Sequence, residues 1–205
     1  MKTWVVNALF TAALLSGAGA SAQAVVGQPA PAFSMKDLQG RTVALADFKG
    51  KHVVLEWVNP GCPFVQKHYN SGNMPATQKS AIDKGVVWLS VSSTSRDAGD
   101  YQPPAELAAW LKSKNAVATA TLDDAGGKLG RAYGARTTPH MYVIDPQGRL
   151  VYAGAIDSKP SASVSDIKTA TNYVNQALAE ALAGKAVSQP QTTAYGCSIK
   201  YARAD

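Results

Sequence analysis

Residues 59–69 read NPGCPFVQKHY and place one cysteine, Cys62, between a Pro-Gly turn and a proline. Proline is favoured at the first position of a helix, because its missing N–H would have no partner there in any case. The segment therefore predicts that Cys62 lies at the start of a helix, where unpaired N–H groups and the helix dipole favour a thiolate. A thiolate is the nucleophilic form of cysteine, so we interpret Cys62 as a reactive residue rather than a buried, inert one.

The chain has one other cysteine, Cys197, in the sequence TAYGCSIKY beyond the last predicted helix. Gly196 permits a close approach of the backbone at this point, and Tyr195 and Tyr201 are expected to pin the C-terminal tail to the domain. Two interpretations follow from this pair of cysteines. Either Cys197 resolves a mixed disulfide at Cys62, or the two residues form a permanent structural disulfide.

Glu56 lies inside the apolar stretch HVVLEWV at residues 52–58. A carboxylate among apolar side chains is unfavourable unless it is paired, and burial raises its pKa. Glu56 is therefore predicted to accept a proton from the attacking or attacked sulfur, directly or through water. The alternative is that Glu56 lies at a strand edge and is solvated. Lys67 follows Cys62 by neither three nor four positions and is expected on the solvated surface of its helix.

The elements that must position these residues alternate between strands and helices. Strands are predicted at residues 42–45, 52–58, 86–92, 118–122, 141–145 and 150–153. Helices are predicted from residue 63 with an interruption at 71–73, then at 75–84, 105–114, 127–133 and, the longest, at 166–183. This order indicates an α/β fold with a mixed central sheet and helices on both faces. Cys62 follows a central strand, at the edge where such sheets bind and react.

The N-terminal region has the features of a secretory signal peptide. Lys2 is followed by a mostly apolar run at residues 4–15 and by the sequence Ala20-Ser21-Ala22, which is a small-residue cleavage site. We therefore expect a signal peptide at residues 1–22, one domain at 25–184 and a tail at 185–205 that carries Cys197. The mature chain is predicted to act in the periplasm or as a secreted protein, with no stable membrane insertion after cleavage.

The composition of the 205 residues is that of a globular protein, with 46% hydrophobic residues, 17% charged residues and a net charge of +6. The basic residues are scattered and form no stripe with interleaved aromatic residues, so no nucleic-acid partner is expected. The chain has three histidines and lacks a paired-cysteine metal motif, so neither a metal nor another cofactor is expected.

Three segments, DFKGK, HVVLEWVNPGC and YGARTTP, together resemble the thioredoxin-like superfamily over about residues 25–184. The chain looks most similar to the redoxin (AhpC/TSA) peroxiredoxin-like branch with a single active-site cysteine followed by proline. The resemblance implies a thioredoxin-like fold and a cis bond between Thr138 and Pro139 that faces Cys62. It further implies that the Thr138 backbone pairs with an extended thiol-bearing or disulfide-bearing substrate protein, and that Pro60 and Pro63 also contact this partner.

The chain also departs from its relatives. Thioredoxins have a second cysteine three residues after the first, where this chain has Val65. Peroxiredoxins have threonine or serine three residues before the cysteine and proline seven before, where this chain has Asn59 and Leu55; they also tend to have arginine at the position of Pro139.

Four functions stay open at this point. The first is an extracytoplasmic thiol–disulfide oxidoreductase that uses Cys62 and Cys197. The second is a thiol peroxidase with unfamiliar peroxide-binding groups. The third is a binding module, not an enzyme, with a structural disulfide. The fourth is a copper-handling protein that uses Cys62 and His140.

Overall fold

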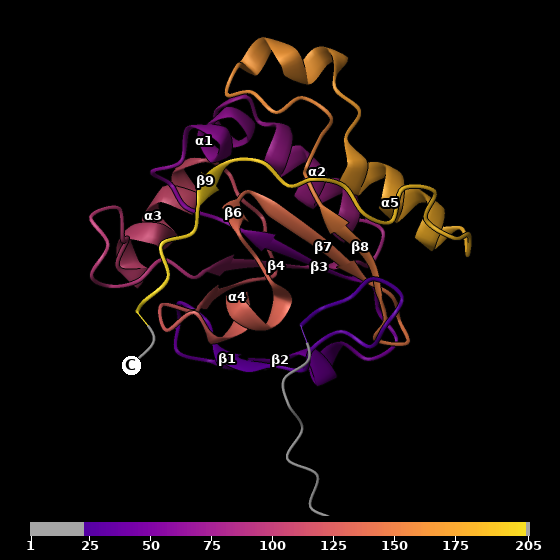
Figure 1. Cartoon of the computed structure of the whole chain (residues 1–205), viewed down its shortest axis with the longest axis horizontal. Coiled ribbons are helices and arrows are strands. Elements are labelled where there is room, and N and C mark those ends of the chain that lie inside the picture. The colour runs from indigo at the N-terminus through magenta and orange to yellow at the C-terminus, as the bar shows by residue number, and fades with distance from the viewer. Residues whose placement is uncertain (1–22, 204–205) are drawn as a thin grey trace, which may run out of the picture.

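The centre of the protein is a five-stranded mixed sheet in the order β5-β4-β3-β7-β8 (Figure 1). The structure is a computed structural model and describes residues 23–203. The strands of this sheet are β3 (Val53–Trp57), β4 (Val87–Ser92), β5 (Ala120–Asp123), β7 (His140–Ile144) and β8 (Leu150–Gly154). Strands β3, β4 and β5 are parallel, whereas β7 pairs antiparallel with both β3 and β8. The predicted mixed sheet and the hairpin of its last two strands are confirmed.

Helices cover both faces of this sheet, as the sequence predicted. They are η1 (Leu45–Phe48), α1 (Pro63–Asn70), α2 (Asn73–Ile82), α3 (Pro104–Ser113), α4 (Lys128–Tyr133), η2 (Val164–Thr169) and α5 (Tyr173–Leu182). Side chains from α1, α2, α3 and α5 join one hydrophobic cluster, and side chains from α4 join a second cluster.

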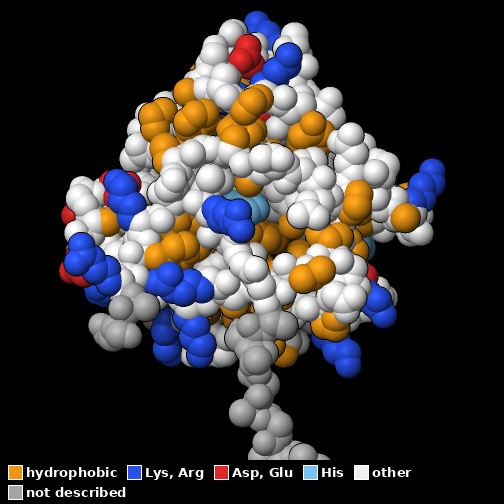
Figure 2. All heavy atoms as spheres, in the orientation of Figure 1, with side chains coloured by type: hydrophobic (Ala, Val, Ile, Leu, Met, Phe, Trp, Pro, Cys, Tyr) orange, Lys and Arg blue, Asp and Glu red, His pale blue; other side chains and the backbone are white. Residues whose placement is uncertain are grey.

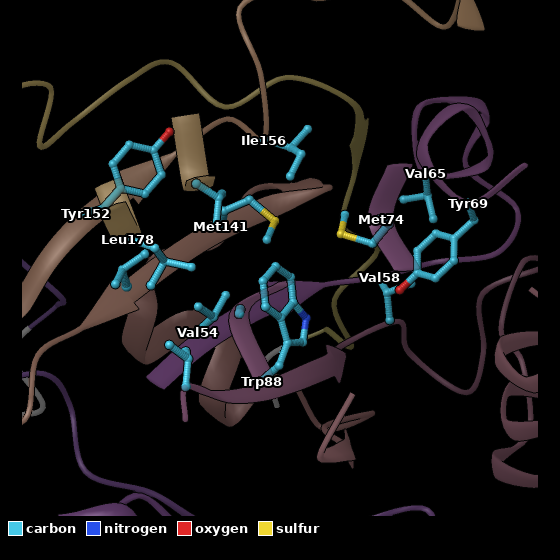
Figure 3. Close-up of a cluster of buried hydrophobic side chains, with 14 of the residues drawn as sticks. Val54, Val58, Val65, Tyr69, Met74, Trp88, Met141, Tyr152, Ile156 and Leu178 are labelled. Atoms are coloured by element: carbon cyan, nitrogen blue, oxygen red, sulfur yellow. The ribbon is translucent and has the colours of Figure 1, made fainter. Parts of the chain in front are cut away.

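The alternation of side chains along β3 separates the two clusters, because successive residues of a strand point to opposite faces. Val54 and the following Val58 belong to the cluster of α1, while Val53, Leu55 and Trp57 belong to the cluster of α4. Figure 3 shows the first cluster, with Trp88 at its centre, Val54 and Met141 on one side and Val58, Val65 and Tyr69 on the other. Glu56 therefore points toward the same face as α1.

The predicted break between the first two helices is confirmed. Helix α1 ends at Asn70, and α2 begins after Gly72, which has a positive φ of 75°. That backbone conformation is strained for any side chain with a Cβ atom, so the glycine is suited to this turn. Side chains of both α1 and α2 belong to the same hydrophobic cluster on either side of this break.

The prediction of one long helix at residues 166–183 is wrong. The segment contains the 3-10 helix η2, then Ala170 in an extended conformation with ψ of 140°, and then α5 from Tyr173. Asn172 ends the interruption, because its side chain accepts a hydrogen bond from the Asn175 N–H and so caps α5. Asn172 also forms an isolated bridge with Asp157.

Two short two-stranded sheets complete the fold. β1 (Ser34–Lys36) pairs with β2 (Thr42–Ala44), and β6 (Thr137–Thr138) pairs antiparallel with β9 (Cys197–Ser198). The second sheet joins the loop before β7 to the C-terminal tail. In Figure 1 the tail, drawn in yellow, leaves α5, crosses the molecule and brings β9 beside β6 and α1.

Candidate active site around Cys62

The turn before Cys62 is held by Asn59. The Asn59 side-chain oxygen accepts a hydrogen bond from the Gly61 N–H at 2.8 Å, and its carbonyl oxygen accepts one from the Cys62 N–H at 3.0 Å. The Cys62 carbonyl oxygen then accepts the first helical hydrogen bond, from the Gln66 N–H at 2.9 Å. Cys62 is thus the N-cap residue of α1, as the sequence predicted, and Pro63 is its first helical residue.

The cis-proline loop lies against Cys62. The bond between Thr138 and Pro139 is cis, and the Cys62 Sγ donates a hydrogen bond of 3.0 Å to the Thr138 carbonyl oxygen. The Cys62 residue is only 1% exposed, so the expectation that this cysteine is not buried is wrong, and Thr138 is 4% exposed. The structure therefore brings together two segments that are separated by more than seventy residues in the chain.

The tail brings Cys197 to the same place. In the pair of β6 and β9, Cys197 is the register partner of Thr138. Gly196 has a φ of +136°, and a Cβ atom at this position would lie 2.0 Å from the Thr138 carbonyl oxygen. Only glycine allows the tail to lie this close to the cis-proline loop, because any side chain would collide with backbone atoms.

The charges around Cys197 disfavour its thiolate. Partial burial, the hydrogen bond and charge of the adjacent Cys62 and the Asp100 carboxylate together raise the pKa of Cys197 to about 12, although Lys200 opposes the shift. Both cysteines are free thiols in the structure. A thiol is a poorer nucleophile than a thiolate, so the raised pKa makes Cys197 a weak nucleophile in this arrangement.

Sequence reasoning missed Asp100, which joins the turn before Cys62 to the tail. Its Oδ2 accepts hydrogen bonds from the Asn59 side chain at 3.1 Å and from Lys200 Nζ at 2.9 Å. Its Oδ1 is buried without a hydrogen-bond partner among the described residues. Asp100 lies in the loop between β4 and α3, where the polar sequence gave no signal of a site.

Glu56 is buried and is not solvated at a strand edge, which excludes the alternative considered from the sequence. Its residue is 0% exposed, and burial raises the pKa of its carboxyl group, although its hydrogen bonds oppose this effect. The donors to this carboxylate are Tyr69 Oη at 2.6 Å, Trp88 Nε1 at 2.8 Å, Gln78 Nε2 at 2.9 Å and Ser90 Oγ at 3.2 Å. Cys62 is not among these donors, so the predicted role in proton transfer stays a prediction.

The two prolines beside Cys62 have different surroundings. Pro60 is buried and its carbonyl oxygen accepts a hydrogen bond from the Gln66 side chain at 2.8 Å, whereas Pro63 is exposed on the first turn of α1. Of the two, Pro63 has the surface for a contact with a substrate. Val65, at the position of a second thioredoxin cysteine, is 1% exposed and belongs to the hydrophobic core.

The prediction that Lys67 lies on a solvated helix surface is wrong, since the residue is only 2% exposed. Its Nζ lies 3.4 Å from Asp157 Oδ2 and donates a hydrogen bond of 3.0 Å to the Lys159 carbonyl oxygen. A buried ammonium group is tolerated when it is paired in this way. His68 is also buried, with its Nε2 3.8 Å from Asp157, and burial lowers its pKa to about 4.

Figure 2 shows the face over which the tail passes. Most basic side chains are scattered around the edge of this face, one lies near its centre beside a histidine, and apolar side chains gather in its upper part. A hollow of about 400 Å3 opens beside the tail and is lined by, among others, Arg136, Thr137, His140 and Thr192. Within residues 23–203, no group of three or more histidine, cysteine, aspartate or glutamate side chains is placed to hold a metal ion. Nor does that part of the chain contain a helix with the length and apolar character needed to span a bilayer.

A cysteine at the N-terminus of a helix, opposite a cis-proline loop on a mixed sheet, defines a protein of the thioredoxin-like redoxin superfamily. The model of the AhpC/TSA family matches residues 26–153, which is more than half of the chain, and the chain therefore belongs to that family.

Two relatives carry related names. The chain is 27% identical over 128 residues to a thiol-disulfide oxidoreductase, ResA, of Bacillus thuringiensis, which covers 62% of this chain and 67% of the relative. It is also 27% identical over 143 residues to a thioredoxin-like protein, YneN, of Bacillus subtilis, which covers 69% of this chain and 79% of the relative.

Solved structures share the fold over more of the chain. A hypothetical protein from Sinorhizobium meliloti has a TM-score of 0.73 and 24% identity, with 88% of this chain and 96% of that chain covered. An uncharacterized conserved protein from Geobacillus kaustophilus has a TM-score of 0.74 and 24% identity, with 88% and 94% covered. The thioredoxin domain of a thiol-disulfide oxidoreductase from Bacteroides vulgatus also shares the fold, with a TM-score of 0.50 and 24% identity over 71% of this chain and 96% of that chain, so the thioredoxin-like fold expected from the sequence is confirmed.

Proposed function

We propose that the chain is a thiol–disulfide oxidoreductase that acts outside the cytoplasm, with Cys62 as the nucleophile and Cys197 as the resolving cysteine. The observation that carries this proposal is the position of Cys197 opposite Thr138, whose carbonyl oxygen accepts the hydrogen bond from Cys62. The name of the relative ResA, a thiol-disulfide oxidoreductase, supports the same class of reaction.

The first step is an exchange at Cys62. After loss of its proton, the Cys62 sulfur attacks one sulfur of a substrate disulfide. The substrate S–S bond breaks, a mixed disulfide forms between Cys62 and the substrate, and the other substrate sulfur leaves as a thiolate that takes up a proton. The N-terminus of α1 favours the thiolate that this step needs.

The second step is resolution by the tail. Cys197 loses its proton and attacks the Cys62 sulfur, the mixed disulfide breaks, and the second substrate thiol leaves. The substrate disulfide has then gained two electrons and two protons, and the protein has become a disulfide between Cys62 and Cys197. The same two steps in reverse oxidise a dithiol substrate, and the redox partner decides the direction.

Three further residues have assigned roles in this proposal. The Thr138 backbone pairs with the extended segment that carries the substrate sulfur, and Pro139 keeps other groups away from Cys62. Glu56 accepts the proton of the exchanging sulfur through water. Burial raises the pKa of Glu56, and this supports the role because a carboxyl group with a raised pKa is a stronger proton acceptor than an ordinary carboxylate.

The test is single-turnover reaction of the reduced protein with a chromogenic disulfide. The wild type is expected to release two thiols for each protein molecule and to end as an intramolecular disulfide. Cys197→Ser is expected to release one thiol and to stop with a mixed disulfide at Cys62. Cys62→Ser is expected to release no thiol on the timescale of the wild-type reaction. If Cys62→Ser reacts as fast as the wild type, the assignment of the nucleophile is wrong.

A peroxidase is the second candidate, because the chain belongs to the AhpC/TSA family and Cys62 is only 1% exposed beneath the tail. A peroxide is small and can reach such a buried sulfur more easily than a protein substrate can. Cys62 would attack the peroxide O–O bond to give a sulfenic acid and an alcohol or water, and Cys197 would then form the disulfide and release water. This function would be favoured if Cys62 reacts with peroxide far faster than free cysteine does, and if Cys62 reacts with disulfides no faster than free cysteine does.

A further inference from the structure

Tyr195 fixes the tail two residues before Cys197. Its hydroxyl donates a hydrogen bond to Asp157 Oδ1 and lies 3.4 Å from His68 Nε2. The Lys67 Nζ lies 5.7 Å from the centroid of its ring, and the Phe64 ring packs edge-on with centroids 5.8 Å apart. We call the four residues that surround this ring, Phe64, Lys67, His68 and Asp157, the tyrosine seat.

The tyrosine seat contains charges that the proposed reaction does not use. The side chains of Lys67 and His68 are 0% exposed, and that of Asp157 is 3% exposed. His68 is held by Asn73, whose side-chain nitrogen lies 2.8 Å from His68 Nδ1. Burying a carboxylate is costly unless its oxygens accept hydrogen bonds. The hydrogen bond from the Tyr195 hydroxyl therefore stabilises the buried Asp157, and the tyrosine seat in turn holds the tail.

The other side of Cys197 is held separately. The Ile199 N–H donates to the Arg136 carbonyl oxygen at 2.9 Å, and the Lys200 carbonyl oxygen accepts from the Ser95 N–H at 2.7 Å. Between the two attachments, Gly196 lies directly on the Thr138 carbonyl. Cys197 is thus held from both directions, and Tyr195 is its upstream attachment.

We propose that Tyr195, through the tyrosine seat, is the positioning residue that holds Cys197 over Cys62 and also keeps the Thr138 edge closed to the extended strand of an external substrate. This inference rests on the proposed function. The tail occupies the place in which a substrate strand would pair, because β9 already pairs with Thr138 in an antiparallel register. Figure 1 shows β9 lying between β6 and the start of α1.

One attachment therefore has two opposite consequences. A docked Tyr195 raises the effective concentration of Cys197 at Cys62, which favours resolution. The same docking excludes an external strand, which slows the first exchange. Loosening Tyr195 must therefore weaken the disulfide between Cys62 and Cys197 and speed the attack of Cys62 on a peptide disulfide. A residue that only stabilised the fold would not produce this pair of changes.

The test uses Tyr195→Phe in the full chain, which keeps the ring and removes the hydroxyl. The first readout is the equilibrium between the protein dithiol and oxidised glutathione, from which the effective concentration of the pair is obtained. We expect Tyr195→Phe to lower this effective concentration roughly tenfold or more, which is the effect of losing a hydrogen bond to a charged group. Tyr173→Phe is the matched control, because it removes a tyrosine hydroxyl at the start of α5, outside the tail.

The second readout is made in Cys197→Ser, so that it does not depend on the redox pair. The probe is a short extended peptide whose cysteine carries a thiopyridyl disulfide, and released thiopyridone reports the attack of Cys62. Adding Tyr195→Phe is expected to raise this rate roughly tenfold, since the strand site opens. Thermal unfolding of every variant confirms that it is folded.

A second variant guards against loss of folding at the seat. Gly196→Ala must displace β9 from Thr138 and is expected to change both readouts in the same directions as Tyr195→Phe. Gly184→Ala is its control, because Gly184 also has a positive φ, of +70°, but no atom within 4 Å of the added Cβ. If Tyr195→Phe and Gly196→Ala, each added to Cys197→Ser and folded, leave the rate with the peptide unchanged from that of Cys197→Ser alone, the inference is wrong. A further outcome is that the wild type forms no reversible Cys62–Cys197 disulfide in glutathione buffers while Tyr195→Phe still raises the rate with the peptide. In that case the proposed function fails, and the conclusion that the tail closes the strand site stands.

Discussion

Cys62 donates a hydrogen bond of 3.0 Å from its Sγ to the carbonyl oxygen of Thr138. Thr138 is also the register partner of Cys197. One residue of the cis-proline loop therefore contacts the sulfur at the start of α1 and aligns the strand that carries the other sulfur. This relationship explains how two cysteines so far apart in the sequence form one site.

Glu56→Gln is expected to destabilise the protein by about 1–3 kcal/mol, because the amide that replaces one carboxylate oxygen cannot accept the hydrogen bonds of buried donors. The affected donors include Trp88 Nε1 and Tyr69 Oη. Urea unfolding measures the loss. Glu106→Gln, at an exposed position in the first turn of α3, is the control and should be nearly neutral.

The same variant tests whether Glu56 takes part in proton transfer. If it does, Glu56→Gln lowers the rate of the first exchange by roughly a hundredfold at neutral pH, which is a usual effect of removing a general base. An unchanged rate in a destabilised but folded variant would assign Glu56 a purely structural role, joining β3 to α1 through Tyr69.

His140 is expected to make the protein less stable in acid. Burial and the nearby Arg136 charge lower the pKa of His140 from 6.5 to about 4, and the Arg136 N–H donates to its Nδ1 at 3.3 Å. Between pH 6.5 and about 4 the unfolded chain binds this proton and the folded chain does not, so stability falls as the pH decreases through this window.

The contribution is fully present above pH 6.5 and amounts to roughly 3 kcal/mol. We expect His140→Asn to remove it, so that the difference in unfolding free energy between wild type and variant changes by this amount between neutral pH and pH about 4. Denaturant unfolding at several pH values measures the difference. Parallel stability curves for the two proteins would contradict the lowered pKa.

Thr192→Val is expected to loosen the first part of the tail. Thr192 Oγ1 accepts a hydrogen bond from the Ala155 N–H at 2.9 Å and lies 2.6 Å from Tyr152 Oη. Valine would leave the buried Ala155 N–H without a partner, at a cost of about 1–3 kcal/mol. Thr193→Val, at the adjacent and exposed position, is the control. Equal stability of the two variants would show that this attachment contributes little.

The predicted signal peptide lies in residues 1–22, outside the residues that the structure describes. Expression of the full chain in a bacterium with a periplasm is expected to yield a mature protein that starts near Gln23. Mass spectrometry of the periplasmic fraction measures the cleavage site. A full-length chain that stays in the cytoplasm would contradict the proposed location.

Much of the fold was predictable because hydrophobic patterns identify buried elements. The segment with Val53, Val54 and Leu55 is apolar at every position except Glu56, which is typical of a strand buried on both faces. The start of α1 was predictable from Pro63, whose local chemistry decides the helix N-terminus.

The rest depends on contacts between distant segments, which no local pattern encodes. Lys67 carries a charge that ordinarily favours solvent, and its burial is made tolerable by Asp157, by the Lys159 carbonyl oxygen and by the Tyr195 ring of the tail. Asp157 follows β8 without any sequence signal of a site. The interruption before α5 depends on the bridge of Asn172 with Asp157, another long-range contact.

The reduction potential of the pair formed by Cys62 and Cys197 tests the central claim most directly. It is measured by quantitative thiol trapping of the purified protein across a glutathione and dithiothreitol series, with Cys62→Ser and Cys197→Ser as single-thiol controls. We predict a reversible transition of two electrons between about −120 and −270 mV, the range of exchange enzymes. A disulfide that resists reduction until below about −300 mV, or no disulfide between these two residues at all, would contradict the account.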